Sequence, residues 1–481
     1  MNLAHSISGL PARGRAVGVR TFSSLRIHNY RLWFVGQTIS QSGSWMQSLA
    51  QGWLVLKLTG SAVDLGITVA LQFAPVLVFG TIGGLVADRV NKRTALLITQ
   101  SAFLLQSAAL SALVFTGSAR LWMIWVLASF YGLINVIDNP TRQTFVMEMV
   151  GRDDLANAIG LNSVIVNASR VVGPAVAAIL IETVGLPWTF AVNASTFLAV
   201  IAALGIMRTA DLHRTAPVSR ARGQIRAGLR YTWSVWELRV PLLMMAVVGT
   251  LSYNFTVIMP LLAVKVFHSG AGALGALMVA MGVGSSIGGL MTGAYRRLGY
   301  RLLVMVTLAF GLLTMAVSLA PTLPLALALL VFVGAASGSF IVAGNSLLQL
   351  HAKGPMRGRV MSLWAIVFLG STPIGGPLTG LLAAHLGTRA ALAIGGSAAV
   401  LAAAGGAVAL RRIRAEQEVE VLASLTPAAT SSGASDECDG PTTRRSGEPL
   451  LAVDAACPER RAAGEPAASG AYRRPTPGAS R

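Results

Sequence analysis

Long apolar stretches recur along almost the whole chain, and short polar turns separate them. Each stretch has roughly the 20 residues that an α-helix needs to cross a bilayer. Twelve of them take up most of the chain between residues 31 and 411, which leaves little chain there for a soluble catalytic domain. They lie at residues 32–56, 66–87, 94–116, 121–145, 156–181, 186–207, 240–264, 272–294, 302–320, 323–350, 360–386 and 390–410. This pattern predicts an all-α membrane protein with twelve transmembrane helices.

The composition agrees with a membrane protein. Apolar residues make up 54% of the chain and charged residues only 12%, whereas a soluble domain is about 25% charged. This excludes a water-soluble globule and a chain that is disordered throughout. The two cysteines, Cys438 and Cys457, lie in a polar tail without a CxxC pair or a nearby histidine. They support neither a disulfide framework nor a metal site, and we expect no bound cofactor.

The positive charges indicate how the helices are oriented. If both termini are cytoplasmic, the inner loops and ends hold 26 of the 38 Lys and Arg, and the outer loops hold four. The four outer residues are Lys57, Arg120, Lys265 and Arg389. Cytoplasmic loops of membrane proteins carry such an excess. The distribution therefore predicts that both termini are cytoplasmic. It also accounts for the net charge of +19, so we do not expect nucleic acid as a partner.

The second six stretches repeat polar and small residues of the first six at nearly the same spacing. The corresponding positions are Asn139 with Asn345, Gln143 with Gln349, and Gly173-Pro174 with Gly376-Pro377. Two helical repeats with a site between them near the middle of the membrane are the plan of many transporters. We therefore expect two six-helix pseudo-repeats.

The predicted helices and loops divide the chain into five parts. A cytoplasmic arm (1–30) precedes an N-terminal six-helix bundle (31–208), and a basic cytoplasmic loop (209–239) leads to a C-terminal six-helix bundle (240–411). The remaining residues, 412–481, are rich in Ala, Pro, Gly, Ser, Arg and Glu. Such a composition buries too little apolar surface to fold, so this cytoplasmic tail is expected to be disordered.

Several motifs resemble a known family. The stretch Gly84-x-x-x-Asp88-Arg89-x-Asn91-Lys92-Arg93 is similar to the loop 2–3 signature of the major facilitator superfamily, and Gly173-Pro174 is similar to its span-five antiporter signature. Longer stretches resemble the secretion-effector branch, which contains bacterial enterobactin exporters and macrolide-efflux proteins. These stretches are GSWMQ at 43–47, DNPTRQ at 138–143, LANA at 155–158 and RGRVMS at 357–362.

The resemblance implies the major facilitator fold and transport by alternating access, with a proton gradient as the energy source. It implies a multi-pass protein of the bacterial cytoplasmic membrane whose partners are a small-molecule substrate, protons and lipid. We expect a monomer that is not an enzyme. The chain has no Walker-type phosphate loop, which disfavours ATP-driven transport, and it has no HExxH motif. An alternative is a membrane receptor or assembly partner that keeps the transporter fold without transport.

Charged residues at membrane depth are few and are the first candidates for function. Asp138 and Arg142 are four residues apart on one helix and can pair, either to lock helices together or as a gate or proton relay. Arg170 could satisfy nearby carbonyls or acids, or could attract an anionic substrate. We take Asp138 and Arg170 as candidates for proton coupling. Asp64 and Glu182 lie near the outer ends of their spans and are expected to be solvated.

A charged group is expected to close the cytoplasmic side. We predict that Asp88, Lys92 and Asp138 form a cluster there, and the resemblance implies that Asp88 faces the eleventh span. The other members of this candidate gate are Arg89, Arg93 and Arg142. Close helix packing is expected at Gly84, Gly173, Pro174, Gly376 and Pro377.

Polar stripes mark candidate walls of a substrate cavity. Ser40, Ser44, Gln47 and Gln51 fall on one face of the first span. Further candidates are Tyr253, Asn254, Asn139 and Asn345. Such groups line a cavity in one interpretation, and in the other they hydrogen-bond to neighbouring helices. Together these features favour a secondary active exporter of amphipathic small molecules of the siderophore or drug type.

Overall fold

A computed structural model of the protein describes residues 23–213, 224–295 and 298–425. The chain divides into two compact units, residues 1–420 and 421–481. The fold below is that of the first unit, since only residues 421–425 of the second unit are described. Within the described residues every regular element is a helix, which agrees with the predicted all-α class.

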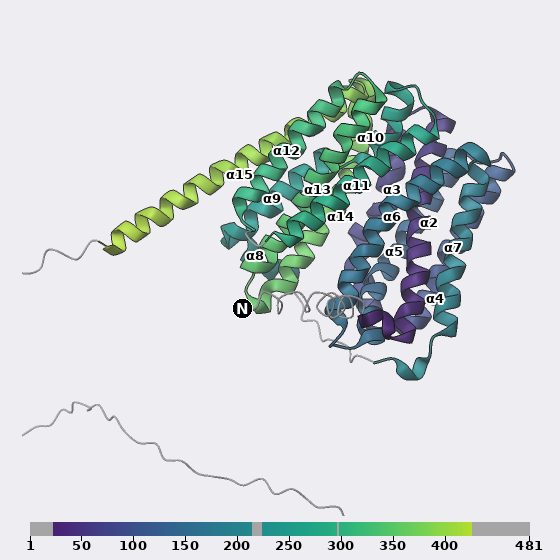
Figure 1. The fold of residues 1–481 in the computed structure, drawn as a ribbon, viewed down its shortest axis with the longest axis horizontal. Helices are drawn as coiled ribbons and strands as arrows, with labels where there is room; N and C mark the ends of the chain where they lie inside the picture. The colour runs from purple at the N-terminus through teal and green to yellow at the C-terminus, as the bar shows by residue number, and fades with distance from the viewer. Residues whose placement is uncertain (1–22, 214–223, 296–297, 426–481) are drawn as a thin grey trace, which may run out of the picture. The chain divides into compact units, whose positions relative to one another are not determined.

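In the described part of the first unit, most consecutive helices are joined by short turns (Figure 1). Their bounds are η1 Ser23–Arg26, α2 His28–Thr59, α3 Ala62–Arg89, α4 Lys92–Phe115, α5 Leu121–Val150, α6 Leu155–Thr183, α7 Leu186–Ile206, η2 Thr209–Asp211, α8 Gln224–Ser234, α9 Trp236–Leu251, α10 Phe255–Leu261, η3 Leu262–Val266, α11 Ala271–Ala294, α12 Tyr300–Leu319, α13 Leu323–His351, α14 Gly354–His385 and α15 Thr388–Leu425.

Eleven of these helical segments are long and apolar enough to cross a membrane, where twelve were expected. The missing one is α2, which has 32 residues and is therefore long enough. It is less apolar because it carries four glutamines, Gln37, Gln41, Gln47 and Gln51. Three of them, Gln37, Gln47 and Gln51, are buried against other helices. A polar side chain is tolerated in a membrane helix where neighbouring helices provide hydrogen-bond partners.

The helices pack as two groups, which Figure 1 shows side by side. The first helix group is α2–α7, in which α2 packs against α6 and α7, and α4 packs against α5 and α7. The second helix group is α9–α15, in which α13 packs against α11 and α12, and α9 packs against α14. The groups meet mainly along two helix pairs, α3 with α14 and α6 with α11, and α10 adds smaller contacts with α2 and α3.

These two pairs touch through small residues. A Cβ atom on Gly66 of α3 would lie 2.5 Å from the carbonyl oxygen of Gly376 on α14, so this approach requires glycine. Gly275 of α11 lies against Ala178 and the carbonyl of Pro174 on α6. Backbones come this close only where the side chain is absent or very small. The small residues therefore allow the two groups to meet backbone to backbone.

The contacts between the groups lie toward one side. We use outer for the side of the turns near residues 60, 185, 268 and 387, following the charge pattern, and inner for the opposite side. On α3 no side chain from 62 to 76 is exposed, and on α11 none from 271 to 286 is exposed. Exposed side chains on both helices begin at the inner half, at Leu77 and Ile287. The two groups are thus in contact at the outer side, whereas side chains of α3 and α11 are exposed at the inner side.

The seventh predicted stretch is not one continuous helix. It consists of α9, α10 and a π-helical turn, η3, with a break at residues 252–254. At the break the side-chain amide of Asn254 donates to the carbonyl of Thr250 at 2.7 Å, taking the place of a helical backbone N–H. Pro260 within α10 lacks an N–H and precedes the π turn.

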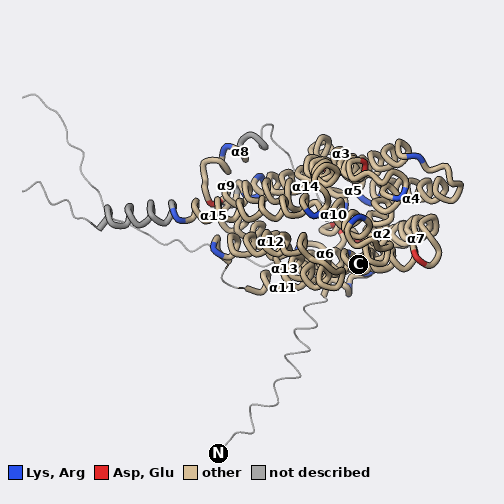
Figure 2. The backbone as a smooth tube through the Cα atoms, turned by 90° about the horizontal axis from the view of Figure 1, so that it is seen from above, with Lys and Arg blue, Asp and Glu red and all other residues tan. Residues whose placement is uncertain are grey.

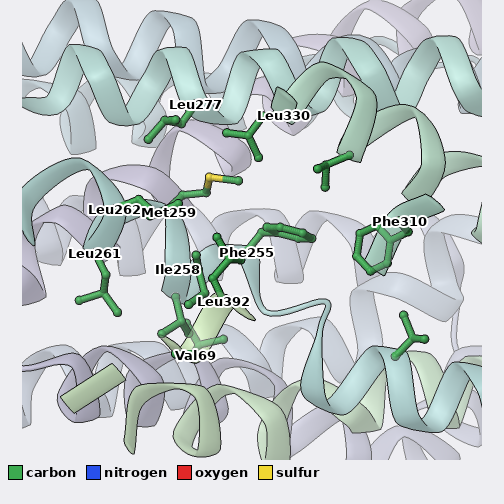
Figure 3. Close-up of a cluster of buried hydrophobic side chains, with 14 of the residues drawn as sticks. Val69, Phe255, Ile258, Met259, Leu261, Leu262, Leu277, Phe310, Leu330 and Leu392 are labelled. Atoms are coloured by element: carbon green, nitrogen blue, oxygen red, sulfur yellow. The ribbon is translucent and has the colours of Figure 1, made fainter. Parts of the chain in front are cut away.

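Apolar side chains fill the space around the break. Figure 3 shows Phe255 and Met259 of α10 beside side chains of α12, α13 and α15. The labelled members from those three helices are Phe310, Leu330 and Leu392, all at most 3% exposed. This tight apolar core holds the broken helix within the second group.

Candidate functional site

Asp138 is a carboxylate in the inner half of α5, and it is 1% exposed. Its Oδ1 accepts hydrogen bonds from Thr99 Oγ1 at 2.8 Å and from Gln100 Nε2 at 2.9 Å, both on α4. Its Oδ2 lies 3.5 Å from Nη2 of Arg142, one turn along α5. A carboxylate at this depth needs such donors, because it has lost its water. The sequence suggested the ion pair, but it did not indicate the two donors from α4.

Arg142 extends this arrangement from α5 to α2. Its Nη1 donates to Gln41 at 2.8 Å and to Gln37 at 3.3 Å, and its Nη2 donates to Asn139 at 2.7 Å. The Arg142 side chain is 23% exposed, in contrast to Asp138. One ion pair thus joins α2, α4 and α5, with the carboxylate enclosed and the guanidinium partly accessible.

The predicted cluster of Asp88, Lys92 and Asp138 needs a correction. Lys92 Nζ lies 2.5 Å from Glu148 Oε1, at the inner end of α5, and both side chains are about one-tenth exposed. Asp138 is held by other groups. The reason is the register of two packed helices, which places the start of α4 beside the end of α5. Asp88 lies half-buried in the last turn of α3, and its contact with α14 remains a prediction.

The other two basic residues of the predicted gate differ from each other. Arg93 donates to the carbonyls of Leu204 at 2.7 Å and Gly205 at 3.2 Å, near the C-terminus of α7. A cation is favourable there because the last carbonyls of a helix are unsatisfied and carry partial negative charge. Arg89 is exposed at the end of α3. Arg93 therefore joins α4 to α7 within the first group.

Arg170 lies near the middle of α6, and its guanidinium carbon is 5.4 Å from the ring centre of Trp45 on α2. Its Nε is buried and has no hydrogen-bond partner among the described residues. The two helices are held close at this level by Gly173, where a Cβ would lie 2.5 Å from the carbonyl of Ser42. Ser42 also donates to Ser169 at 3.2 Å. The guanidinium is thus fixed beside an aromatic face without an anionic partner in the described part of the chain.

Gln47 and Gln51 lie in contacts between helices, and their place on a cavity wall remains a prediction. Gln47 is 2% exposed. It donates to Gln106 of α4 at 3.0 Å and accepts from Asn193 of α7 at 2.6 Å. Gln51 is 1% exposed and accepts from Gln72 of α3 at 3.1 Å. This is the interhelical alternative, because the face of α2 that bears Gln47 meets α4 and α7.

The cavity candidates of the second group have mixed environments. Tyr253 packs with its ring 5.7 to 6.5 Å from the rings of Phe255, Phe368 and Phe310. Asn254 is 4% exposed, and its Oδ1 is buried without a hydrogen-bond partner in the described residues. Asn345 is half-buried and accepts from Gln349 at 2.6 Å. The unpartnered oxygen of Asn254 at the helix break is thus a polar group still available for a hydrogen bond.

Comparisons with known proteins agree on a family and a fold. A family profile described as a transmembrane secretion effector matches residues 19–441. The chain is 28% identical over 364 residues to the multidrug efflux pump Tap of Mycolicibacterium fortuitum, covering 73% of this chain and 88% of the relative. It is 24% identical over 383 residues to the enterobactin exporter EntS of Citrobacter koseri, covering 79% and 91%.

A solved structure supports the fold alone. The inward-facing, occupied structure of a bacterial homologue of the human lysosomal transporter Spinster matches with a TM-score of 0.63 at 15% identity. The match covers 79% of this chain and 96% of that chain.

Proposed function

This chain belongs to the transmembrane secretion effector family of the major facilitator superfamily, and on this basis we propose that it exports amphipathic small molecules by secondary active transport. The relatives include a multidrug efflux pump and an enterobactin exporter. We assign the chain to the bacterial cytoplasmic membrane, with both termini inside, as a monomer. In this proposal α2 also crosses the membrane, which brings the number of crossings to twelve. The two helix groups are then the two six-helix repeats.

The observation that carries the proposal is the one-sided contact between the groups. The backbone approach of α3 to α14 at Gly66 and Gly376, and of α6 to α11 at Gly275, lies in the outer halves of these helices. The inner halves of α3 and α11 carry the exposed side chains. An alternating-access transporter that is open to the inner side has this asymmetry, because one end of the interface must be closed while the other is separated.

We further propose that a proton gradient drives export and that Asp138 with Arg142 couples the proton to the movement. Asp138 is enclosed by α4 and α5, and its partner Arg142 reaches the glutamines of α2. A neutral Asp138 would no longer hold Arg142 by charge, which would loosen α2 from α5. A change of a few kcal/mol in such a contact is enough to shift a two-state equilibrium.

Dye retention in cells tests the proposal. Cells that lack their own efflux pumps are loaded with anionic, neutral and cationic amphipathic dyes, with or without the full chain. We expect the chain to lower retention of at least one dye, and a protonophore to remove the effect. Asp138→Asn, at matched membrane abundance, should behave like the empty control. Unchanged retention of every dye, with abundant protein in the membrane, would contradict export.

A further inference from the structure

The carboxylates of this chain are distributed unevenly between its two halves. No Asp or Glu occurs between Glu237 and Glu416, a stretch that contains nearly all of the second helix group. Figure 2 accordingly shows blue basic residues but no red acidic ones along α11 to α14. A cation in a membrane-embedded site is normally paired with an acidic side chain. Residues 238–415 of the second group therefore offer no carboxylate with which to bind a cationic substrate.

The carboxylates of the first group either lie near helix ends or are already bound by other side chains of the protein. Asp64 and Glu182 lie at the outer ends of α3 and α6. Glu148 pairs with Lys92 near the inner ends of α5 and α4. Asp138 is the deep one, and its oxygens are held by Thr99, Gln100 and Arg142, all within the first group. Its 1% exposure leaves no surface for contact with a ligand in this conformation.

Arg170 is a cation at membrane depth that has no anionic partner among the described residues. It is about 15 residues from the start of α6 and 13 from its end, roughly 20 Å from either end at 1.5 Å per residue. Its contact with the Trp45 ring is a weak cation–π interaction that does not neutralise the charge, and its Nε is buried without a hydrogen-bond partner among the described residues. An uncompensated guanidinium at this depth is costly. Such a group is expected where its counter-charge arrives with a ligand.

Trp45 indicates which chemical group of a ligand would lie next to its anionic group. It lies at the middle of α2, half-buried, with the guanidinium of Arg170 over its ring. An aromatic face beside a cation suits a ligand that has an anionic group next to an aromatic or apolar surface. The planar guanidinium can bind a carboxylate or sulfonate through two parallel N–H bonds, which an ammonium cannot do.

From these charges we infer that the exported substrate is an amphipathic anion, and that Arg170 binds its anionic group while Trp45 contacts its apolar part. This inference rests on the proposed function, because it names the substrate class of the same transport path. It assigns Arg170 to substrate recognition rather than to proton coupling.

Two aromatic dyes of similar size and opposite charge test the inference: carboxyfluorescein, an anion, and ethidium, a cation. Binding of each dye to the purified full-length protein is measured by fluorescence anisotropy, and transport is measured in energised everted vesicles. We expect the unmodified chain to prefer carboxyfluorescein. Arg170→Gln should weaken its binding at least about tenfold, the usual effect of removing a charged hydrogen-bond partner. Arg170→Lys should retain part of the preference, since the charge remains.

A matched control removes a cation elsewhere. Lys265→Gln deletes an exposed positive charge at the outer end of η3 and should leave both dyes unaffected. A preference for ethidium, or unchanged carboxyfluorescein binding in a folded Arg170→Gln protein, would overturn the inference while leaving export intact. If neither dye nor any other probe is moved in a gradient-dependent way, the proposed function itself fails. Binding of carboxyfluorescein that depends on Arg170 would still support recognition of an anion.

Discussion

The carboxylate of Glu182, at the outer end of α6, accepts a 2.7 Å hydrogen bond from the backbone N–H of Gly272 in the first turn of α11. The sequence predicted a solvated interface residue, and the side chain is indeed exposed, but it also joins the two helix groups. The first N–H groups of a helix have no partner within the helix and attract negative charge. Glu182 therefore caps α11 from the opposite group and holds the outer side closed.

We predict that Glu182→Gln favours opening of the outer side. The amide keeps an acceptor but loses its charge, and a charge at a helix terminus is worth about 0.3–1 kcal/mol at an exposed position. Labelling of Ala178→Cys from outside by an impermeant thiol reagent should rise about two- to fivefold, in a background with Cys438 and Cys457 replaced by serine. Asp64→Asn is the control, because Asp64 lies in the first turn of its own helix, α3. Equal labelling of both variants would argue against this role.

A second prediction concerns the ion pair between Asp138 and Arg142. Asp138→Asn should abolish gradient-driven export and lower the thermal stability of the purified protein, because Arg142 loses its counter-charge. Breaking a buried pair costs up to about 3–5 kcal/mol, and the cost here should be smaller because Arg142 is 23% exposed. The double variant Asp138→Asn, Arg142→Gln should recover stability but not transport. Recovery of transport by the double variant would show that the pair is only structural.

A third prediction separates structural glutamines from those near the transport path. Gln47→Leu leaves Gln106 and Asn193 without one of their hydrogen-bond partners, which costs about 1–3 kcal/mol for buried groups. We expect lower protein abundance and an equal loss of transport for every dye. Gln41→Leu, which removes a partner of Arg142 at a half-buried position, should impair transport at nearly normal abundance. A change of dye selectivity in Gln47→Leu, with normal abundance, would instead place Gln47 on the cavity wall.

The features that the sequence predicts well depend on neighbours along the chain. Apolar length located the helices, and four-residue spacing within α5 brought Asp138 and Arg142 together. The helical periodicity of the sequence also placed Gln47 and Gln51 on one face of α2. It could not indicate which helices that face would meet, and it therefore left cavity lining and interhelical bonding as alternatives.

The features that the sequence did not predict depend on tertiary packing. The bond of Asp138 to Thr99 spans 39 residues, that of Lys92 to Glu148 spans 56, and that of Glu182 to Gly272 spans 90. Each is fixed by the register between two packed helices. Apolar lipid-facing and helix-facing residues look alike in a membrane sequence, because both sides of the helix are dry. Hydrophobic pattern therefore carries little information about that register.

Proton-driven export is the central claim, and the orientation of membrane vesicles tests it most directly. The dye whose retention the chain lowers in cells is added to everted and to right-side-out vesicles containing equal amounts of the protein. We predict accumulation in everted vesicles after respiration acidifies their lumen, and release of the dye when a protonophore collapses the gradient. Accumulation only in right-side-out vesicles, or accumulation in everted vesicles that is the same with and without the gradient, would contradict the account.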